Sequence, residues 1–221
     1  IVHLDEALAV VDKPAGLVVH PAPSHEGTTL VDELGDILGG GEDPERPGIV
    51  HRLDKGTSGL LVVARGEEAH AALQAQVQAR EVERVYLALA NGKIGSRTGT
   101  IDAPIGRASR QRHRMAVSGA ASREARTHFT VLELLSLESY LEAKLETGRT
   151  HQIRAHFAAI GHPLTGDPTY GGPRRYGLRR QFLHAHRLAF EHPFSGERLS
   201  FESGLPDDLA AALETARAAQ R

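Results

Sequence analysis

The sequence predicts an α+β fold with a mixed, largely antiparallel central sheet flanked by helices and loops. Strand-like patterns outnumber helix-like patterns, and they come in runs rather than in a regular βαβ alternation. Residues 140–146 alternate strictly, so that Leu141, Ala143 and Leu145 face one way and the charged residues between them face the other. Such alternation is typical of a half-buried antiparallel strand.

Short apolar runs bounded by turn residues predict the other strands. The run at residues 59–64 is continuously apolar after its glycine, which indicates a buried strand. Further strands are expected at residues 8–12, 16–20, 85–90, 183–190 and 198–202, and Pro14 and Gly16 mark a turn between the first two. The arginine-rich residues 107–126 are interpreted as a loop or an irregular hairpin.

Apolar residues at helical spacing, together with capping signals, indicate four helices. Thr29 is the expected N-cap of the first, which ends at the three glycines of residues 39–41. Thr150 is the expected N-cap of the third, and Pro206 opens the last. The apolar residues at helical spacing are Leu30, Leu34, Ile37 and Leu38 in the first helix and Ile153, Phe157 and Ile160 in the third. The second and last helices are expected to turn inward Ala69, Ala72, Leu73 and Val77, and Leu209, Ala212, Leu213 and Ala216.

The composition narrows the class of protein. With 221 residues, the chain is long enough for one sizeable domain, and we expect residues 1–221 to form a single domain. Cysteine is absent, which excludes disulfides, thiolate catalysis and cysteine-dependent zinc sites. The start carries no signal-peptide pattern and no methionine, so we expect a fragment of a longer cytoplasmic protein. The apolar runs are too short to cross a bilayer, so no membrane partner is expected.

The charge is unevenly distributed. A net charge of −2 argues by itself against nucleic-acid binding. Two clusters of basic residues nevertheless stand out, and they comprise Arg107, Arg110, Arg112, His113, Arg114, Arg123 and Arg126 in the first, and Arg174, Arg175, Arg179, Arg180 and Arg187 in the second. They are either solvated loops or contacts to phosphate groups.

One acidic residue occupies a position typical of catalysis. Asp54 lies between a polar loop and the buried strand 59–64, in a turn that contains Gly56 and Gly59. Loops at the ends of strands on a rigid scaffold carry many catalytic groups. The alternative is a surface carboxylate that pairs with Arg52 or Lys55.

Six ordered motifs resemble one enzyme family. The string from His51 to Gly59, HRLDKGTSG, resembles the signature of the ribosomal-large-subunit (A-type, RluA-type) pseudouridine synthases. The resemblance covers almost the whole chain, and its other segments are residues 11–21, the Arg-x-Tyr-x-Ala motif at 84–88, the arginine motif LETGRTHQIRAH at 145–156, the string at 161–171, and His-Pro-x-Ser-Gly at 192–196. The resemblance implies the pseudouridine synthase catalytic fold over residues 1–221, without the N-terminal S4 domain that many members carry.

The implied reaction is the isomerisation of uridine to pseudouridine in structured RNA. The bond between N1 and C1′ breaks, the uracil turns, and C5 becomes attached to C1′. No redox step or external group is needed, so no cofactor is expected. The expected partner is large-subunit ribosomal RNA, with transfer RNA as the alternative, and we expect a monomer.

The resemblance also assigns the catalytic residues. Asp54 is the catalytic carboxylate, which attacks the sugar, stabilises positive charge on it or abstracts a 2′ proton, and each route needs the ionised form. Arg154 is expected to pair with Asp54 and lower its pKa, with Arg149 as the rival for that role. Tyr86 is expected to stack on the flipped uracil and to help remove the C5 proton, although a strand tyrosine is ordinarily a core residue.

The remaining site residues are expected to contact RNA. A base inside folded RNA has to be flipped out before it can react. Arg52 is expected to fill the vacated stack, because guanidinium groups stack on bases, and a salt bridge to a nearby acid is its alternative. The other expected RNA contacts are His51, Arg149, His151, Gln152, Thr57 and Lys13.

Other functions are less well supported by the sequence. His184 and His186 share a strand face but have no third ligand in view, so no metal is expected. Asp54-Lys55-Gly56-Thr57 is faintly similar to the phosphorylated motif of ion pumps, which need membrane helices, and phosphatases need an aspartate where Gly56 stands. An inactive RNA-binding relative is the third class, and the retained Asp54, Tyr86 and Arg154 argue against it.

Overall fold

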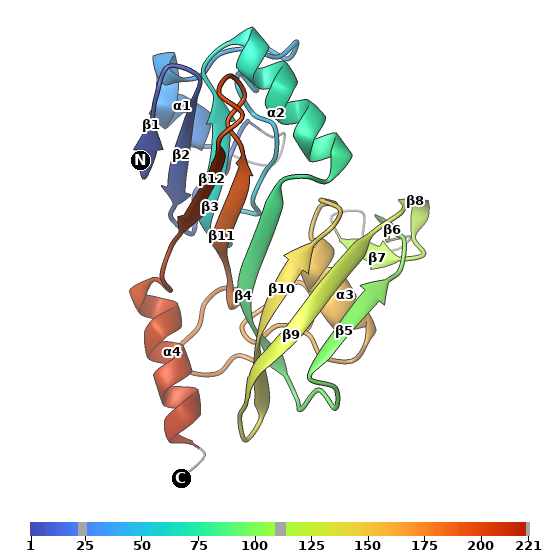
Figure 1. Ribbon diagram of the computed structural model, residues 1–221. Helices are drawn as coiled ribbons and strands as arrows, with labels where there is room; N and C mark the ends of the chain where they lie inside the picture. The colour runs from blue at the N-terminus through green and yellow to red at the C-terminus, as the bar shows by residue number, and fades with distance from the viewer. Residues whose placement is uncertain (22–25, 109–113, 220–221) are drawn as a thin grey trace. The chain divides into compact units, whose positions relative to one another are not determined.

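The computed structural model describes residues 1–21, 26–108 and 114–219 (Figure 1). The chain forms two compact units. The first contains residues 1–84 and 185–203, and the second contains residues 85–184 and 204–221. Among the helices in the described ranges, none combines the length and the apolar character that crossing a bilayer requires.

The first unit contains a sheet of five strands. These are β1 (His3–Leu4), β2 (Leu8–Lys13), β3 (Ser58–Ala64), β11 (Leu183–Glu191) and β12 (Arg198–Glu202). The order is β1-β2-β3-β11, and β12 pairs with β11. β2 runs antiparallel to β1 and β3, and β12 runs antiparallel to β11. Every residue of β3 is buried, in agreement with the continuous apolar run that predicted this strand.

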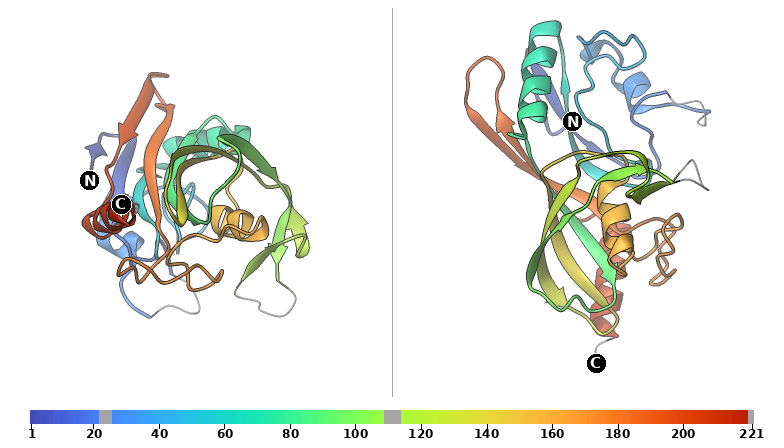
Figure 2. Two further views of the ribbon diagram at one scale, coloured as in Figure 1. Left: turned by 90° about the horizontal axis from the view of Figure 1, so that it is seen from below. Right: turned by 90° about the vertical axis from the view of Figure 1, so that its right-hand side faces the viewer.

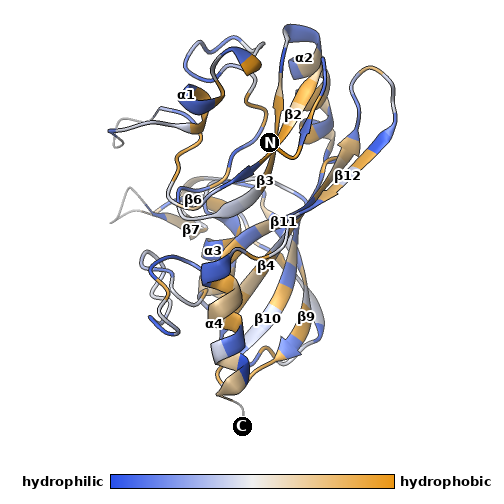
Figure 3. Cartoon of the chain, turned by 90° about the vertical axis from the view of Figure 1, so that its left-hand side faces the viewer, coloured by the Kyte–Doolittle hydropathy of each residue, from blue (hydrophilic) through white to orange (hydrophobic). Residues whose placement is uncertain are grey.

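Two helices complete the first unit. α1 (Leu30–Leu34) begins at Thr29, whose side chain accepts a hydrogen bond from the backbone of Asp32, while the Asp32 side chain accepts one from the backbone of Thr29. This reciprocal capping box explains why the helix begins there. α2 (Glu67–Ala79) places Ala69 and Leu73 in the core. In Figure 3 the core strand β2 is coloured mainly as hydrophobic, whereas hydrophilic residues lie along α2.

The second unit is built on a curved antiparallel sheet in the order β4-β10-β9-β5. Its strands are β4 (Glu83–Asn91), β5 (Thr98–Asp102), β9 (Arg126–Leu134) and β10 (Glu138–Leu145). The sheet curves around α3 (Gln152–Ala159), as Figure 2 shows in its left view. Phe157 of α3 packs edge-on against Phe129 of β9, with ring centroids 5.7 Å apart.

A small sheet and a last helix belong to the same unit. The small sheet has the order β7-β6-β8, from β6 (Ile105–Arg107), β7 (Met115–Val117) and β8 (Ala120–Arg123). α4 (Asp207–Ala218) buries its predicted inward residues, which are Leu209, Ala212, Leu213 and Ala216. They join a core cluster with Leu89 of β4 and Phe182.

The predicted α+β class with a largely antiparallel sheet is confirmed. One predicted strand is absent from the structure. Residues 16–20 form no strand and make only a single bridge, from Val18 to Thr29. Residues 107–126, expected to be a loop or an irregular hairpin, contain the end of β6, then β7, β8 and the start of β9, and the irregular register between β6 and β8 agrees with the hairpin alternative. β1, β5, most of β6 and β9 were not predicted.

Two predicted helix boundaries are also wrong. The first helix ends at Leu34 and continues only as a 3-10 turn over Gly35–Ile37, rather than extending to the glycines at 39–41. Thr150 does not cap α3, because the N-cap is His151 in the left-handed conformation, with no side-chain cap.

A glycine fixes the start of β3, and this gives a test. Gly59 has a φ of +111°, and a Cβ added there would lie 2.3 Å from the carbonyl oxygen of Ala185. Gly59→Ala should therefore lower the free energy of unfolding by about 2 kcal/mol or more, through strain and the forced shift of β11.

Urea denaturation measures this loss. Gly66→Ala is the matched control, because Gly66 is extended and has open space around its Cβ position. It should change stability by less than about 1 kcal/mol. Equal losses in the two variants would contradict the assigned role of Gly59.

Candidate active site

Asp54 lies in the loop that leads into β3. Its backbone carbonyl oxygen accepts a hydrogen bond from the backbone N–H of Thr57 at 3.0 Å, which closes a turn. The neighbours Leu53 and Thr57 are buried, whereas Asp54 itself is half-buried. The turn thus holds the carboxylate at the boundary between the protein interior and the solvent, and not sealed in a dry core.

Lys13 holds the base of this loop. The side chain is 1% exposed, and its ammonium group donates to the carbonyl oxygens of Pro14, Leu17 and Lys55 at 2.8, 2.9 and 3.5 Å. The backbone N–H of Gly16 also donates to the Lys55 carbonyl, at 2.7 Å. Two loops that are distant in sequence are therefore joined beside Asp54. We revise the role of Lys13 from RNA contact to positioning, because its three donors point at protein oxygens.

His51 is held as a neutral ring. Its Nε2 accepts a hydrogen bond from the backbone N–H of Val62 in β3, at 3.2 Å. Burial, assisted by the positive charge of Arg84, lowers the pKa of His51 to about 3. Its Nδ1 is buried with no hydrogen-bond partner among the described residues. His51 therefore carries no positive charge near neutral pH, which removes a charge-based RNA contact from its expected role.

Arg52 is exposed, and its described partner is a histidine. The Nη1 atom of Arg52 donates to Nε2 of His20 at 3.1 Å, while Nδ1 of His20 donates to the carbonyl oxygen of Pro21. Burial lowers the pKa of His20, and the nearby charge of Arg52 lowers it further. The neutral ring acts as an acceptor that holds one end of the guanidinium, and no carboxylate in the described ranges pairs with Arg52. The exposure of Arg52 is compatible with the predicted role in stacking on a base, which stays a prediction.

Tyr86 belongs to β4 in the second unit. It lies opposite Ala143 of β10, and 5% of its surface is exposed. Strand pairing thus fixes its backbone, and burial restricts its ring. Asp54 belongs to the first unit, whereas Tyr86 and Arg154 belong to the second, so their predicted assembly around one uridine stays a prediction.

Arg154 of α3 has a carboxylate partner that was not predicted. Its Nε donates to Oδ2 of Asp167 at 2.7 Å, and its Nη2 donates to Oδ1 at 3.0 Å. Both side chains are almost fully buried. The side-on pair uses two of the five guanidinium N–H donors, so it does not exclude the expected pairing with Asp54, which stays a prediction. The expectation that a buried arginine needs a carboxylate is thus met by Asp167.

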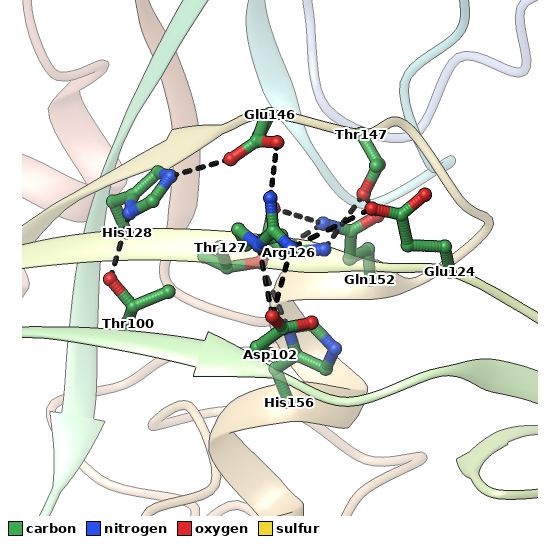
Figure 4. Close-up of polar contacts among 10 residues, drawn as sticks. All are labelled: Thr100, Asp102, Glu124, Arg126, Thr127, His128, Glu146, Thr147, Gln152 and His156. Carbon is green, nitrogen blue, oxygen red and sulfur yellow. Dashed lines mark hydrogen bonds and ion pairs between the residues drawn. The ribbon is translucent and has the colours of Figure 1, made fainter.

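A buried hydrogen-bond network holds the segment before Arg154 (Figure 4). Oε1 of Gln152 accepts from the Thr147 hydroxyl at 2.7 Å and from the backbone N–H of Arg149 at 3.0 Å. Its Nε2 donates to the Arg126 carbonyl and to the Thr127 hydroxyl oxygen. All four hydrogen bonds of the amide are made within the protein, so we revise Gln152 from an RNA contact to a positioning residue.

His156 extends this network. Its Nδ1 accepts from the Thr127 hydroxyl at 2.9 Å, and its Nε2 donates to the carbonyl oxygen of Ala103 at 2.9 Å. Burial lowers its pKa, which keeps the ring neutral. This series of hydrogen bonds, from Thr147 to the carbonyl oxygen of Ala103, therefore fixes the segment 147–156 against the curved sheet.

The two other predicted contacts in this segment are better placed for RNA. Arg149 is half-buried, and its Nε donates to the Glu124 carbonyl at 3.0 Å. His151 has a φ of +55°, and its Nδ1 lies 3.3 Å from the hydroxyl of Tyr170. Thr57, in contrast, is 2% exposed, so contact through its side chain would need the loop to move. All three RNA contacts stay predictions.

Many arginines of the two basic clusters are already neutralised. Arg126 donates to Asp102 and Glu146, at 2.9 and 2.6 Å, as Figure 4 shows. In the second cluster, the arginines that pair with acidic groups are Arg175 with Glu138, Arg180 with Asp208, and Arg187 with Glu83 and Glu202. Arg110, Arg112 and His113 lie outside the described residues.

Within the described part of the two basic clusters, four exposed arginines have no acidic partner. They are Arg107, Arg123, Arg174 and Arg179. Arg114 lies with its guanidinium 4.7 Å from the centre of the Tyr170 ring, beside a cavity of about 470 Å³ that α3 and β7 line. These residues are the candidates for phosphate contact. No group of three or more metal-ligating side chains occurs in the described part of the chain.

Comparisons with known proteins agree on one family. The family model described as RNA pseudouridylate synthase matches residues 7–159. Ribosomal large subunit pseudouridine synthase D of Pseudomonas aeruginosa is 50% identical, over 95% of this chain and 69% of that protein. An uncharacterized RNA pseudouridine synthase of Bacillus subtilis, YlyB, is 48% identical over 96% and 71%. The synthase D of Nitrosomonas europaea is 49% identical, and this chain spans only 64% of its length.

Solved structures agree with the sequence comparison. Human RNA Pseudouridylate Synthase Domain Containing 1 superposes with a TM-score of 0.74 and 29% identity, over 96% of this chain and 86% of that one. Human RNA Pseudouridylate Synthase Domain Containing 4 gives a TM-score of 0.79 and 25% identity, over 98% and 92%. The predicted catalytic fold is thereby confirmed.

The neutral state of His51 gives a test by pH. The ring titrates at about 3 in the folded chain and near 6.5 when unfolded, so the unfolded chain binds the extra proton between these values. The stability that neutral His51 contributes is complete above pH 6.5 and is lost as the pH falls toward 3. From pH 7.5 to about 4.5, this group alone should remove about 2.7 kcal/mol from the free energy of unfolding.

Urea unfolding of the wild type and of His51→Gln at both pH values isolates this loss. Between the two pH values, the free energy of unfolding of the variant should fall by about 2.7 kcal/mol less than that of the wild type, since all other groups titrate in both proteins. The same decrease in both would mean that His51 titrates normally.

Proposed function

The chain belongs to the RNA pseudouridylate synthase family, and on that premise we propose that it isomerises specific uridines of 23S ribosomal RNA, by flipping the nucleotide and using Asp54 to break and re-form the base–sugar bond. In this reaction the base loses a proton at C5 and gains one at N1, so the product has the composition of the substrate. Nothing has to be oxidised, reduced or transferred from another molecule, which is why we expect no cofactor.

The observation that carries the proposal is the position of Asp54. Asp54 is half-buried on a turn that the backbone hydrogen bond from Thr57 closes. The Lys13 ammonium donates to the carbonyl oxygen of Lys55 in the same turn. A rigid loop reduces the motion that would otherwise separate a reacting group from the sugar. Partial exposure leaves the carboxylate accessible to a nucleotide that has left its stack.

Tyr86 and Arg154 supply the other two proposed roles. Strand pairing and burial on β4 hold the Tyr86 ring in one orientation, and because only 5% of its surface is exposed, stacking on uracil requires neighbouring side chains to move. Its hydroxyl is the proposed acceptor of the C5 proton or the group that relays it. Arg154 is the proposed cation that keeps Asp54 ionised, since a neighbouring positive charge favours a carboxylate.

RNA binding is proposed to rest on the unpaired arginines. Arg107 and Arg123 stand on neighbouring strands of the small sheet, and Arg174 and Arg179 stand in the loop before β11. Guanidinium groups without an acidic partner are able to neutralise phosphates. Arg52 is proposed to occupy the stack that the flipped nucleotide leaves.

The choice of RNA rests on the relatives. Synthase D proteins carry the large ribosomal subunit in their names, and this is the reason for favouring 23S ribosomal RNA over transfer RNA. A cytoplasmic monomer is the corresponding expectation.

Chemical mapping of pseudouridine in cellular RNA tests the reaction and the target together. Cells with and without the gene are compared, and the purified chain is then incubated with protein-free RNA. A site lost with the gene and restored by the chain supports the proposal. A site in transfer RNA would correct the target, and tight RNA binding with no product would indicate an inactive relative.

Asp54→Asn should still bind RNA but form no product. The amide keeps the shape of the side chain but removes the ionised oxygen, so the single-turnover rate should fall by at least about 1,000-fold. Filter binding should give an RNA Kd within about 3-fold of the wild type.

Asp43→Asn is the control for the loss of one acidic charge in the same unit. Asp43 is exposed and forms an ion pair with exposed Arg46. Its rate should stay within about 2-fold of the wild type, because the pair has little effect on structure. Product formation by Asp54→Asn at a normal rate would remove Asp54 from its proposed role.

Tyr86→Phe separates stacking from proton transfer. The ring remains, so RNA binding should be retained, while loss of the hydroxyl should lower the rate by about 100-fold if it moves the C5 proton. Release of tritium from RNA labelled at C5 of uridine measures that step directly. Tyr140→Phe, on the neighbouring strand β10, should react normally, and a normal rate for Tyr86→Phe would leave only the stacking role.

A further inference from the structure

The partner of Arg154 is a carboxylate for which no role has been assigned. Asp167 follows α3 in the string from Gly161 to Gly171, and its side chain is fully buried. Its two oxygens accept from Nε and Nη2 of Arg154 at 2.7 and 3.0 Å. A side-on pair of this kind fixes the plane of the guanidinium as well as its position.

Asp167 is itself held in place by its own loop. Its Oδ1 also accepts from the backbone N–H groups of Thr169 and Tyr170, at 2.9 and 3.2 Å. The backbone N–H of Gly172 donates to the Asp167 carbonyl at 2.9 Å. The carboxylate therefore accepts four hydrogen bonds, which fix its orientation. Arg154 thus pairs with an acceptor that is itself held rigidly.

Tyr170 restricts the same guanidinium from another direction. The central carbon of Arg154 lies 5.2 Å from the centre of the Tyr170 ring, and that of Arg114 lies 4.7 Å from it. The Tyr170 hydroxyl donates to the carbonyl of Met115 and accepts from its backbone N–H, at 3.0 and 3.1 Å. The ring is thus tied to β7 and cannot turn away from Arg154.

We propose that Asp167 is a positioning residue that orients the guanidinium of Arg154 toward the reacting nucleotide. The Tyr170 ring restricts the same guanidinium from a second side. The proposal rests on the function proposed above, because aiming Arg154 matters only if Arg154 acts in the reaction. Asp167 occupies the Nε–Nη2 edge, so the guanidinium is oriented with its Nη1 corner turned away from Asp167. A carboxylate or a phosphate oxygen of the reacting complex is the natural acceptor for that corner.

A purely structural ion pair would behave differently. Structural pairs affect the amount of folded protein, whereas a positioning residue affects the rate of the folded, RNA-bound enzyme. The chain offers a matched structural pair in the same unit, since Glu138 is equally buried and accepts from Arg175 and from the Tyr176 hydroxyl, each at 2.7 Å. Substitutions at Glu138 therefore control for the loss of a buried carboxylate.

The first measurement is the single-turnover rate of pseudouridine formation with saturating enzyme, beside the RNA Kd. Asp167→Asn should lower the rate by at least about 30-fold and leave the Kd within about 3-fold, because a guanidinium misplaced by about 1 Å loses the aligned contact. Glu138→Gln should leave both values within about 3-fold. Equal losses of rate in the two variants would overturn the proposal.

A second variant covers the case in which Asp167→Asn does not fold. Asp167→Glu keeps the buried charge pair but adds one methylene, which displaces the guanidinium while preserving charge balance. Its rate should fall by about 10-fold in protein that unfolds thermally as a cooperative unit. Glu138→Asp is its control, and a wild-type rate for Asp167→Glu would overturn the proposal.

A double variant shows whether Asp167 acts through Arg154. Once Arg154→Lys has removed the side-on geometry, adding Asp167→Asn should slow the reaction by less than about 3-fold more. Losses that multiply would mean that Asp167 acts by another route. Failure of the proposed function is seen separately, as absence of product from the wild type or normal turnover by Asp54→Asn.

Discussion

The buried pair of Arg154 and Asp167 is the interaction on which the order of the second unit most depends. Moving either charge into the protein interior is costly, and only a partner of opposite sign with well-directed hydrogen bonds offsets that cost. The pair also joins a helix to the loop that follows it, and Tyr170 joins both to the small sheet. Removal of one partner would leave a charge without compensation, so the pair constrains both residues more strongly than apolar packing would.

Local patterns predicted β2, β3, β4, β10, β11 and β12 and placed α1 to α4 in the right segments, but they missed β1, β5 and β9. Apolar and charged residues alternate over 140–146 because one face of β10 is buried. The capping box of α1 depends only on the four consecutive residues from Thr29 to Asp32. Residues 16–20 have a strand-like composition, yet their carbonyl groups are used elsewhere. Leu17 accepts from the Lys13 ammonium, and Val18 and Val19 accept from the first backbone N–H groups of α1, so no ladder forms.

In the candidate site, too, a feature carried by one continuous string could be predicted, whereas contacts between distant segments could not. Asp54 was proposed as the catalytic residue from a continuous string, and the residue is half-buried in the structure, while its role stays a prediction. Asp167 could not be identified as the partner of Arg154, because the pairing depends on the path of a loop thirteen residues away. Likewise, a lysine in a conspicuous motif suggests RNA binding, and only the fold reveals that the Lys13 ammonium is enclosed by carbonyl oxygens.

The close approach at Gly59 limits how such an enzyme can be retargeted. The backbone of β3 lies against the backbone of β11 at Ala185, with no room for even a methyl group between them. A change in the path of the Asp54 turn would therefore have to be matched by a change in the neighbouring strand. Divergence or engineering toward new RNA targets is expected to proceed through the arginine-bearing loops and the small sheet, while the segment that leads into β3 is inherited unchanged.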